Sequence, residues 1–318
     1  MPVLSPRRVF RRARPSLERL LRALIRHRPT RSVLNAIYAR LGRRAIELVY
    51  VRTAKIFRDV GGGSGVGTWT VRFAGRAVRL PLRGDRMWLD WDEAVSILGH
   101  EPDIKRCYAS LLEGAWRPEL FVDVGANYGT HSLLFLVAGV PALTFEPNDS
   151  CHEYFREACA ASGVTPDLQP VALGAVPGQL ALYFPPGETW LGSTEPEVIE
   201  RLRREGSVPL ERRDVEVRCL DQYGDRFAGK RALVKIDAEG HEQAILQGAE
   251  RVLRDHRPLV IFEALPGSDR QSVAKLFTDA GYEIGFLPAS GVWAAASVSE
   301  YVGATVSDFL AVPRELAR

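Results

Sequence analysis

Residues Phe121–Thr130 read FVDVGANYGT, in which apolar and polar residues alternate and then meet two glycines separated by Ala-Asn-Tyr. Apolar residues resume at Leu133, in the run LLFLVAGV. The pattern predicts a buried strand over 120–125, a tight glycine turn and a helix over 129–138. It also raises the question of which ligand, if any, the turn holds.

Strands and helices alternate along most of the chain after Glu119. Further strands are expected at 141–146, 168–173, 232–237, 258–263, 282–287 and 308–313, and helices at 150–161, 240–254 and 269–280. This order is typical of a doubly wound parallel sheet of the α/β class. Ligands of such sheets bind outside the carboxyl ends of the strands, where the winding reverses, so we expect the functional residues there.

The charge of the chain is distributed unevenly. The net charge is +3, but residues 1–58 contain 16 Lys and Arg against 2 acids, a net +14, so the remainder must carry −11. We expect a basic, partly disordered helical arm over 1–60, followed by a glycine linker, a hairpin and a helix over 61–118. The main domain then covers 119–318, with an insertion at about 179–219.

The basic arm has two interpretations. Its helical patterns fit either a packed pair of helices with a solvated basic face, or attachment to an anionic membrane surface or a protein partner. The chain contains no run of about 18 apolar residues, which a membrane-spanning helix requires. Its four cysteines form no C-x-x-C pair. We therefore expect no metal site and a cytoplasmic location, peripheral at the inner membrane face if the arm binds lipid.

The glycine turn has three interpretations: a structural turn alone, a G-x-G-x-x-G dinucleotide site, or a site for a cofactor without phosphates. Asn127 stands where the dinucleotide motif has its middle glycine, which disfavours a pyrophosphate. Asp123 ends the strand and is placed to accept a hydrogen bond from an ammonium group. Glu146, in LTFEPN, ends the next strand and is placed to accept hydrogen bonds from both ribose hydroxyls. These residues fit a nucleoside ligand, and the missing glycine favours S-adenosylmethionine over NAD.

Five segments of the chain read FVDVGANYGTHSLLF, TFEPN, PVALG, LVKIDAEGHEQAILQGAERVL and PLVIFEA. In order and spacing, over about Phe121–Val312, they resemble the motifs of the FkbM-type S-adenosylmethionine-dependent methyltransferase family. The resemblance implies a class I methyltransferase (Rossmann-like) fold with a doubly wound seven-stranded sheet. Its last two strands, 282–287 and 308–313, would form a reversed hairpin at one edge.

The resemblance also implies a site for S-adenosyl-L-methionine. The methionine end of this cofactor would be lined by Asp123, Gly125, Asn127 and Gly129. Glu146 would hold the ribose, and Ala172 and its neighbours would flank the adenine. Because the third strand end reads QPVALG, where many relatives have an acid or Asn, we expect the adenine contacts to be made largely by the backbone.

The segment LVKIDAEGHEQAI ends the fourth strand at Asp237 and begins a helix near Gly240. Methyl transfer needs an aligned nucleophile that loses its proton. We expect the catalytic residues to be Asp237, which orients cofactor or substrate, and His241, which accepts the proton of a hydroxyl. The alternative is that the acids at this helix start, Glu239 and Glu242, only favour the helix dipole.

Three further residues are predicted substrate contacts. They are Glu239, Glu263 at the end of the fifth strand, and Trp190 in the interruption, where a tryptophan among Pro and Gly suits stacking against a sugar. HEQAI also begins like a zinc-protease helix, but Ile245 stands where the second histidine would be.

O-methylation of a hydroxyl is the leading functional hypothesis. As the resemblance implies, the hydroxyl would belong to a sugar, a glycolipid precursor or a secondary metabolite, so the partner is a small-molecule or glycan acceptor. A nucleic-acid methyltransferase is disfavoured because the body of the chain is acidic. Two further hypotheses stay open, an NAD-dependent oxidoreductase and a non-catalytic interaction protein on the same fold.

Overall fold

A computed structural model gives the structure of the 318-residue chain. It describes residues 17–58, 66–185, 192–193, 199–200, 203–204, 209–238, 240–288 and 293–317. The chain divides into two compact units, Met1–Pro102 and Asp103–Arg318.

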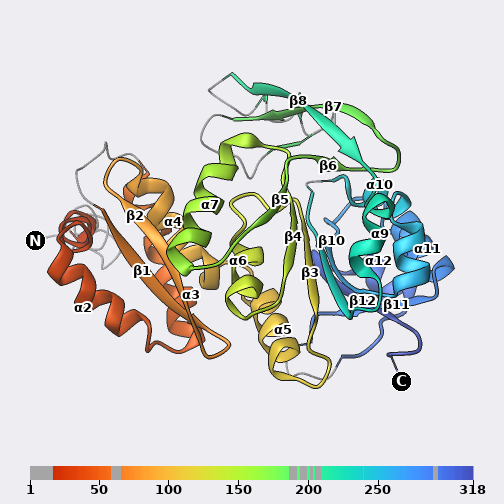
Figure 1. The fold of residues 1–318 in the computed structure, drawn as a ribbon, viewed down its shortest axis with the longest axis horizontal. Helices are drawn as coiled ribbons and strands as arrows, with labels where there is room; N and C mark the ends of the chain where they lie inside the picture. Colours follow the sequence, from red (N-terminus) through yellow and green to blue (C-terminus); the bar gives the residue numbers. More distant parts are fainter. Residues whose placement is uncertain are drawn as a thin grey trace, which may run out of the picture. The chain divides into compact units, whose positions relative to one another are not determined.

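A seven-stranded sheet forms the centre of the second unit, with the strand order β11-β12-β10-β9-β3-β4-β5 (Figure 1). The strands are β3 (Leu120–Val124), β4 (Ala142–Phe145), β5 (Asp167–Gln169), β9 (Ala232–Ile236), β10 (Leu259–Glu263), β11 (Tyr282–Phe286) and β12 (Asp308–Pro313). The five strands from β10 to β5 are parallel, and β12 runs antiparallel to both β10 and β11. This order confirms the predicted fold class, including the reversed hairpin at the edge.

The winding of the sheet reverses between β3 and β9. From β3 the chain moves outward to β4 and β5, and it then returns to pair β9 with the other side of β3. The crevice that such a reversal leaves lies at the carboxyl ends of β3 and β9. These are the strands that end at the glycine turn and just before Asp237.

Helices cover both faces of the sheet, as Figure 1 shows. On one side lie α5 (Pro102–Glu113), α6 (Thr130–Val137) and α7 (His152–Ser162), and on the other α9 (Gly224–Phe227), α10 (Glu242–Gln247) and α11 (Arg270–Asp279). The chain also forms α12 (Val298–Gly303), and 3-10 turns at Asp149–Cys151 and Leu220–Tyr223.

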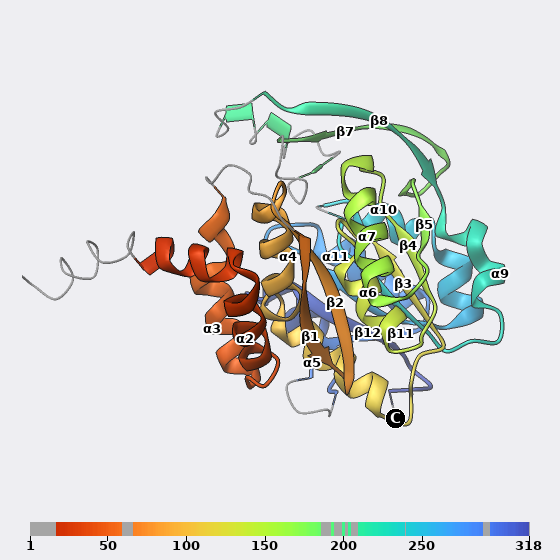
Figure 2. The same cartoon turned by 60° about the vertical axis from the view of Figure 1, so that its left-hand side comes forward.

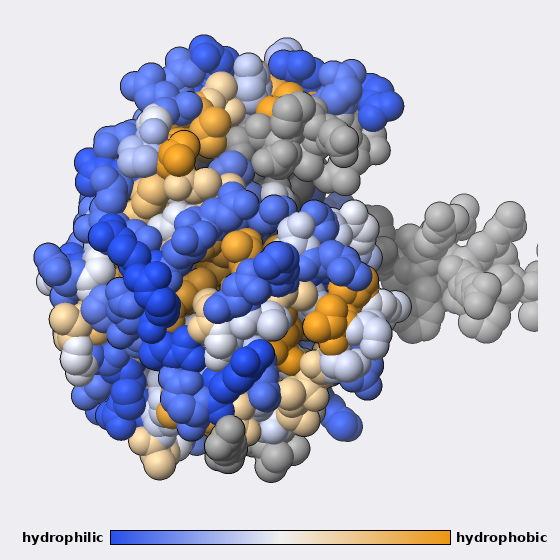
Figure 3. Space-filling view, turned by 90° about the vertical axis from the view of Figure 1, so that its right-hand side faces the viewer, coloured by the Kyte–Doolittle hydropathy of each residue, from blue (hydrophilic) through white to orange (hydrophobic). Residues whose placement is uncertain are grey.

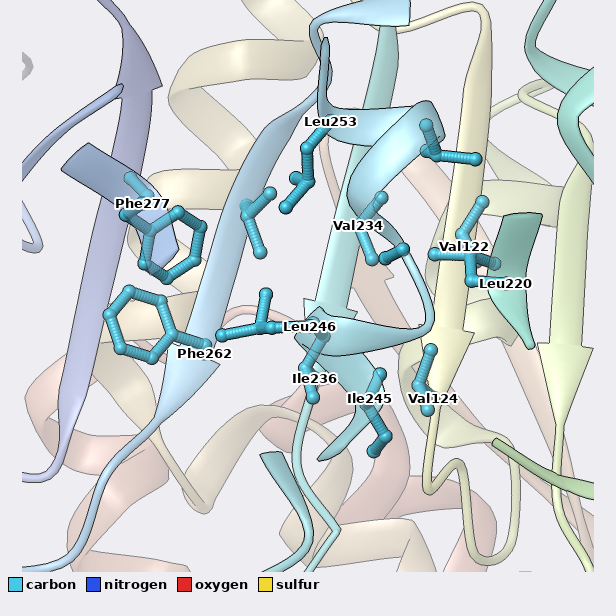
Figure 4. Close-up of a cluster of buried hydrophobic side chains, with 14 of the residues drawn as sticks. Val122, Val124, Leu220, Val234, Ile236, Ile245, Leu246, Leu253, Phe262 and Phe277 are labelled. Atoms are coloured by element: carbon cyan, nitrogen blue, oxygen red, sulfur yellow. The ribbon is translucent and has the colours of Figure 1, made fainter. Parts of the chain in front are cut away.

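The central strands are mostly apolar because both of their faces are covered. All five residues of β3 and of β9 are buried, as expected for parallel strands between two helical layers. Figure 4 shows one of the two faces, where side chains of β3, β9 and β10 meet α10, α11 and Leu253. On the opposite face, Phe121 stacks on Phe135 of α6 with ring centroids 3.9 Å apart. The face that Figure 3 shows is mostly hydrophilic, with hydrophobic side chains in small groups.

The predicted strand over 168–173 was wrong, because two strands of different sheets occupy this segment. β5 ends at Gln169, and β6 (Ala172–Leu173) joins a three-stranded sheet of order β6-β8-β7, with β7 (Gly178–Phe184) and β8 (Glu211–Arg218). Pro170 lies between them and has no N–H for a ladder hydrogen bond. The chain turns there, and the Val171 N–H donates to the Gln169 carbonyl at 2.9 Å.

The predicted helix over 240–254 is also interrupted. α10 ends at Gln247, and a π-helical turn follows at Val252–His256. A Cβ at Gly248 would lie 2.0 Å from the carbonyl oxygen of Gly174. The close approach of this loop explains why a glycine stands here.

In the described residues of the first unit, helices pack with a β-hairpin (Figure 2). A helix covers residues 17–26, and α2 (Arg28–Tyr38), α3 (Arg43–Thr53), the 3-10 turn Ala54–Phe57, β1 (Val66–Phe73), β2 (Arg76–Arg83) and α4 (Met87–Gly99) follow. The predicted hairpin is confirmed, with its turn at Ala74 (φ 44°) and Gly75 (φ 73°), as a two-residue hairpin turn requires. Most of the predicted glycine linker lies outside the described residues.

Aromatic side chains form the centre of this first unit. The rings of Trp69 and Trp91 lie 5.2 Å apart, and Tyr38 of α2 contacts Trp69 at 5.3 Å. The Asn35 amide pairs with both backbone groups of Thr70, so α2 is attached to the edge of β1. None of the helices in the described residues is long and apolar enough to cross a membrane.

Candidate active site

A cleft opens at the carboxyl ends of β3, β4 and β9, where the sequence predicted the ligand to bind. Gly125, Asn127, Glu146 and Asp237 line it. The three-stranded sheet forms a further wall of the cleft through side chains including Ala172, Leu180 and Leu182. The cleft contains about 850 Å³ of empty space, counting the solvent at its mouth. This volume suits a ligand of nucleoside size.

The glycine turn depends on glycine because two strand ends touch there. Gly125 has φ 75°, and a Cβ on it would lie 1.8 Å from the carbonyl oxygen of Asp237. The Asp237 N–H in turn donates to the Val124 carbonyl at 3.1 Å. Gly129 has φ 67°, and a Cβ on it would lie 2.2 Å from the Phe155 ring. The first glycine therefore joins β3 to β9, and the second lets α6 approach α7.

Asn127, between the two glycines, adopts the left-handed conformation with φ 49°, which Asn tolerates better than most residues. Its N–H donates to Glu146 Oε2 at 2.6 Å, and its side-chain oxygen accepts from Cys151 Sγ at 3.0 Å. The Asn127 side chain is thus part of the turn. The turn therefore differs from a dinucleotide-binding loop at Asn127, where that loop has its middle glycine.

Glu146 connects the glycine turn to the turn after β4. Its two oxygens accept from the N–H groups of Asn127, at 2.6 Å, and Asn148, at 2.7 Å. Burial raises the pKa of Glu146 to about 7, although both hydrogen bonds oppose that change. Each carboxylate oxygen has a second acceptor site. Glu146 therefore keeps acceptor capacity toward a ligand in the cleft that it lines.

Asn148 is a site residue that the sequence motifs did not single out. It lines the cleft and is only 2% exposed. Its Oδ1 accepts from the Ser150 N–H at 3.1 Å, but its Nδ2 has no hydrogen-bond partner among the described residues. Leaving a buried donor unpaired costs roughly 1–3 kcal/mol, so a ligand acceptor is expected opposite this amide. In the sequence, Asn148 is marked by its position, two residues after the acid that ends the strand in TFEPN.

A buried cation joins the two acids at the ends of β3 and β9. Lys235 lies beside Asp123 in the strand register, and its Nζ donates to Asp237 Oδ2 at 2.7 Å. Oδ2 of Asp123 accepts from the N–H and hydroxyl of Ser132 at 3.0 and 2.8 Å, whereas Oδ1 has no hydrogen-bond partner among the described residues. Burial raises the pKa of Asp123, and the Lys235 charge opposes that change.

The cleft therefore contains Asp237 but not Asp123. Asp237 lines the cleft, with its side chain 25% exposed. Asp123 is fully buried behind the turn and bonds to the first turn of α6. Lys235 was not singled out from the sequence, because an isolated lysine in a buried strand gives no pattern.

The loop after β9 places His241 in the cleft and turns Glu242 inward. His241 lines the cleft at the N-cap of α10. Glu242 Oε1 accepts from the N–H groups of Ala238, at 2.9 Å, and Gly240, at 3.2 Å, and burial raises its pKa. Glu242 thus stabilises the loop that presents Asp237 and His241.

The remaining predicted residues have different placements. Ala172 lines the cleft, whereas Glu263 ends β10 opposite Asp308 and is not among the residues of the cleft wall. Trp190 and Glu239 lie outside the described residues. His131 is buried, with Lys105 Nζ 3.0 Å from its Nε2 and the Tyr108 hydroxyl 2.9 Å from its Nδ1.

The composition of the cleft restricts its ligand. None of the described residues that line it is Lys or Arg, the side chains that usually neutralise phosphate groups. Within the described part of the chain, no group of His, Cys, Asp and Glu is arranged to hold a metal ion. Apolar side chains, including Val171, Leu180 and Leu182, offer contacts for a nucleobase.

A curated relative and solved structures resemble the chain. The hexuronic acid methyltransferase AglP of Haloferax volcanii is 28% identical over 170 residues, which are 54% of this chain and 66% of AglP. A methyltransferase FkbM from Methylobacillus flagellatus matches with a TM-score of 0.37 and 16% identity, over 71% of this chain and 54% of its own. A T. thermophilus 16S rRNA methyltransferase in complex with AdoMet and guanosine matches with a TM-score of 0.40 and 11% identity, over 79% and 52%.

The fold assignment depends on the strand order, since these structural similarities are weak. The family is established by the sequence. A model of the methyltransferase FkbM domain matches residues 123–284, just over half of the chain. The match begins at Asp123 and includes both Glu146 and Asp237. The family expected from the motifs is thereby confirmed, and the protein belongs to the methyltransferase FkbM domain family.

Proposed function

We propose that this methyltransferase binds S-adenosylmethionine in the cleft and methylates a sugar hydroxyl of a small-molecule or glycan acceptor. The main support is the combination, at the reversal of the sheet, of the glycine turn with Glu146 and Asn148, whose Nδ2 has no hydrogen-bond partner among the described residues. The name of the relative AglP, a hexuronic acid methyltransferase, supports the class of acceptor.

The residues of the cleft fit this cofactor. Glu146 and Asn148 offer an acceptor and a donor for the ribose, and Ala172, Leu180 and Leu182 offer an apolar wall for the adenine. The backbone of the glycine turn would hold the methionine end. Bound S-adenosylmethionine supplies an electrophilic methyl group on a positively charged sulfur.

Asp237 and His241 are the candidates to receive the proton of the acceptor. Both line the cleft at the end of β9. Oδ2 of Asp237 is held by Lys235, which fixes the carboxylate and leaves Oδ1 for a hydroxyl. Positioning accounts for about 7–11 kcal/mol of barrier lowering in well-oriented systems, and a general base adds about 10²–10⁴-fold. The main task of the cleft is therefore alignment.

Two measurements test this function directly. Calorimetric titrations with S-adenosylmethionine and with NAD distinguish the proposed cofactor from the dinucleotide alternative, and we expect heat only with the former. Cell extract treated with the enzyme and the cofactor is then screened for mass gains of one methyl group. Gains on sugars or glycolipids support the proposal, whereas gains confined to nucleic acid contradict it.

The affinity for S-adenosylhomocysteine is expected to fall as the pH drops through about 7, the pKa of Glu146. Ribose hydroxyls donate to the ionised carboxylate, so the ligand binds this form best. Below the pKa the carboxyl is protonated and the affinity falls by up to about tenfold per pH unit, while above it the affinity levels off. Titrations by calorimetry at about pH 6, 7 and 8 measure this slope. Glu146→Gln has no titrating group there and should give a weaker, pH-independent affinity; an unchanged slope in this variant would assign the titration elsewhere.

Replacing Asn148 with Asp should weaken S-adenosylhomocysteine binding by about 10- to 100-fold. The substitution keeps the oxygen that accepts from the Ser150 N–H, but it exchanges the unpaired Nδ2 donor for an acceptor. Calorimetry measures the affinity, and thermal unfolding shows whether the turn is preserved. A variant of wild-type affinity would show that Nδ2 does not face the ligand.

A further inference from the structure

The helices of the first unit present a surface without exposed acids. Among the described residues 17–58, both acids, Glu18 and Glu47, are half-buried. The exposed cations of the same segment are Arg19, Arg26, Arg28, Arg40, Arg43, Arg44, Arg52, Lys55 and Arg58. We call the exposed surface of residues 17–58 the basic face; its excess of cations favours an anionic partner.

The basic face also exposes large aliphatic side chains at helical spacing. On α2, Val33 is 61% and Ile37 55% exposed. On α3, Leu48 is 56% and Val51 74% exposed. Leu17 and Leu20 are similarly exposed on the helix over 17–26. Each pair is three or four residues apart and therefore lies on one side of its helix.

Cations flank the aliphatic pairs of α2 and α3. Just beyond the end of α2, Arg40 follows Ile37 by three residues. On α3, Arg44 precedes Leu48 by four residues, and Lys55, in the 3-10 turn after α3, follows Val51 by four. Exposed aliphatic and cationic side chains thus share one side of α3, rather than occupying opposite sides as in an ordinary amphipathic helix.

We propose that the basic face docks on an anionic lipid bilayer. The aliphatic side chains would enter the boundary between headgroups and acyl chains, and the guanidinium groups would lie at the level of the lipid phosphates. The exposed aliphatic pairs do not belong to the core of this unit, which is built from Tyr38, Phe57, Trp69 and Trp91. This inference is independent of the proposed sugar acceptor.

Two other occupants fit the basic face less well. Single-stranded nucleic acid is bound by basic grooves that also offer aromatic rings for stacking, whereas the large apolar side chains exposed in the described residues 17–58 are all Leu, Ile or Val. A second copy of this chain would bring a second surface of the same positive charge against the first, which opposes association. The experiment described below distinguishes nucleic acid and a second copy from a lipid surface.

Point substitutions in the full chain are preferable to deletion of the helices. Asn35 and Tyr38 of α2 bond and pack onto β1, so deletion would uncover the aromatic core. One variant replaces the aliphatic pair of α2, Val33→Gln with Ile37→Gln. A second reverses charge on α3, Arg43→Glu with Arg44→Glu.

Matched controls come from the second unit. Val176→Gln removes an aliphatic side chain that is 71% exposed, and Arg156→Glu reverses an exposed cation of α7. Each protein is sedimented with vesicles of phosphatidylcholine mixed with phosphatidylserine, and with vesicles of phosphatidylcholine alone. Thermal unfolding and the mass in solution are measured for every variant.

We expect the wild type to bind only the anionic vesicles. Each paired variant should lower the partition coefficient by about tenfold or more, with the Tm preserved, and both controls should bind like the wild type. Binding by both paired variants at the wild-type level would overturn the proposal, as would loss in the charge variant alone, which would exclude insertion of the aliphatic side chains. A concentration-dependent dimer that these substitutions abolish would assign the face to a second copy, and tighter binding to RNA than to vesicles would assign it to nucleic acid.

Discussion

Asp237→Asn is expected to lower the rate of methyl transfer by about 10²–10⁴-fold while the affinity for S-adenosylhomocysteine stays within severalfold of the wild type. Asn keeps the volume of Asp and an oxygen that accepts from Lys235, which now donates to Asp237 Oδ2 at 2.7 Å. It loses the negative charge that would take the proton of a hydroxyl. The rate is measured under saturating cofactor with an acceptor found in the extract screen, and the affinity by calorimetry.

His241→Asn separates the two candidates for the base. Both side chains line the cleft, but only replacement of the residue that accepts the proton should lower the rate by the full factor of about 10²–10⁴. With Asp237 as the base, His241→Asn loses much less activity than Asp237→Asn. A large loss in the His241 variant alone would reverse the two roles, and unchanged rates in both would place the base elsewhere.

The parts of the fold that the sequence predicted are those determined by local patterns. The alternation in FVDVGANYGT determines a buried strand and a turn, because burial on both faces and positive φ leave few residue types suitable. Gly125 and Gly129 both have positive φ. The position of Glu146 at the end of β4 and of Asp237 just after β9 then follows from the βαβ rhythm, since parallel strands end at one edge.

The missed parts depend on partners that are distant in sequence. The split of 168–173 between two sheets depends on the pairing of Ala172 with Val217, 45 positions along the chain, and Pro170 alone was a weak indication. The role of Asn148 depends on which buried donors are left unpaired, and that is known only once every neighbour is placed. Asp123 illustrates the same limit: the motif places it at the turn, but only the contact with Ser132 shows that it is directed away from the cleft.

Replacing Gly125 is expected to cost more stability than its left-handed backbone conformation alone accounts for. Gly125→Ala should lower the stability by about 3 kcal/mol or more, a loss of about 6 °C or more in Tm for a unit of this size, and should abolish measurable S-adenosylhomocysteine binding. The left-handed φ accounts for roughly 1–2 kcal/mol of this loss. The rest comes from the Cβ that would lie 1.8 Å from the Asp237 carbonyl oxygen. Asp237 cannot yield freely, because its N–H is bonded to Val124.

Gly139→Ala is the matched control, because Gly139 has φ 81° and no atom within 4 Å of the added Cβ. This substitution loses stability through the left-handed backbone conformation, but its added Cβ contacts no other atom. We expect it to lose only about 1–2 kcal/mol and to bind the ligand like the wild type. The difference between the two variants, measured by thermal unfolding and calorimetry, then isolates the contact of β3 with β9. If both variants lost the same stability and both kept binding, the two strand ends would be able to separate without consequence, and the cleft would not depend on their contact.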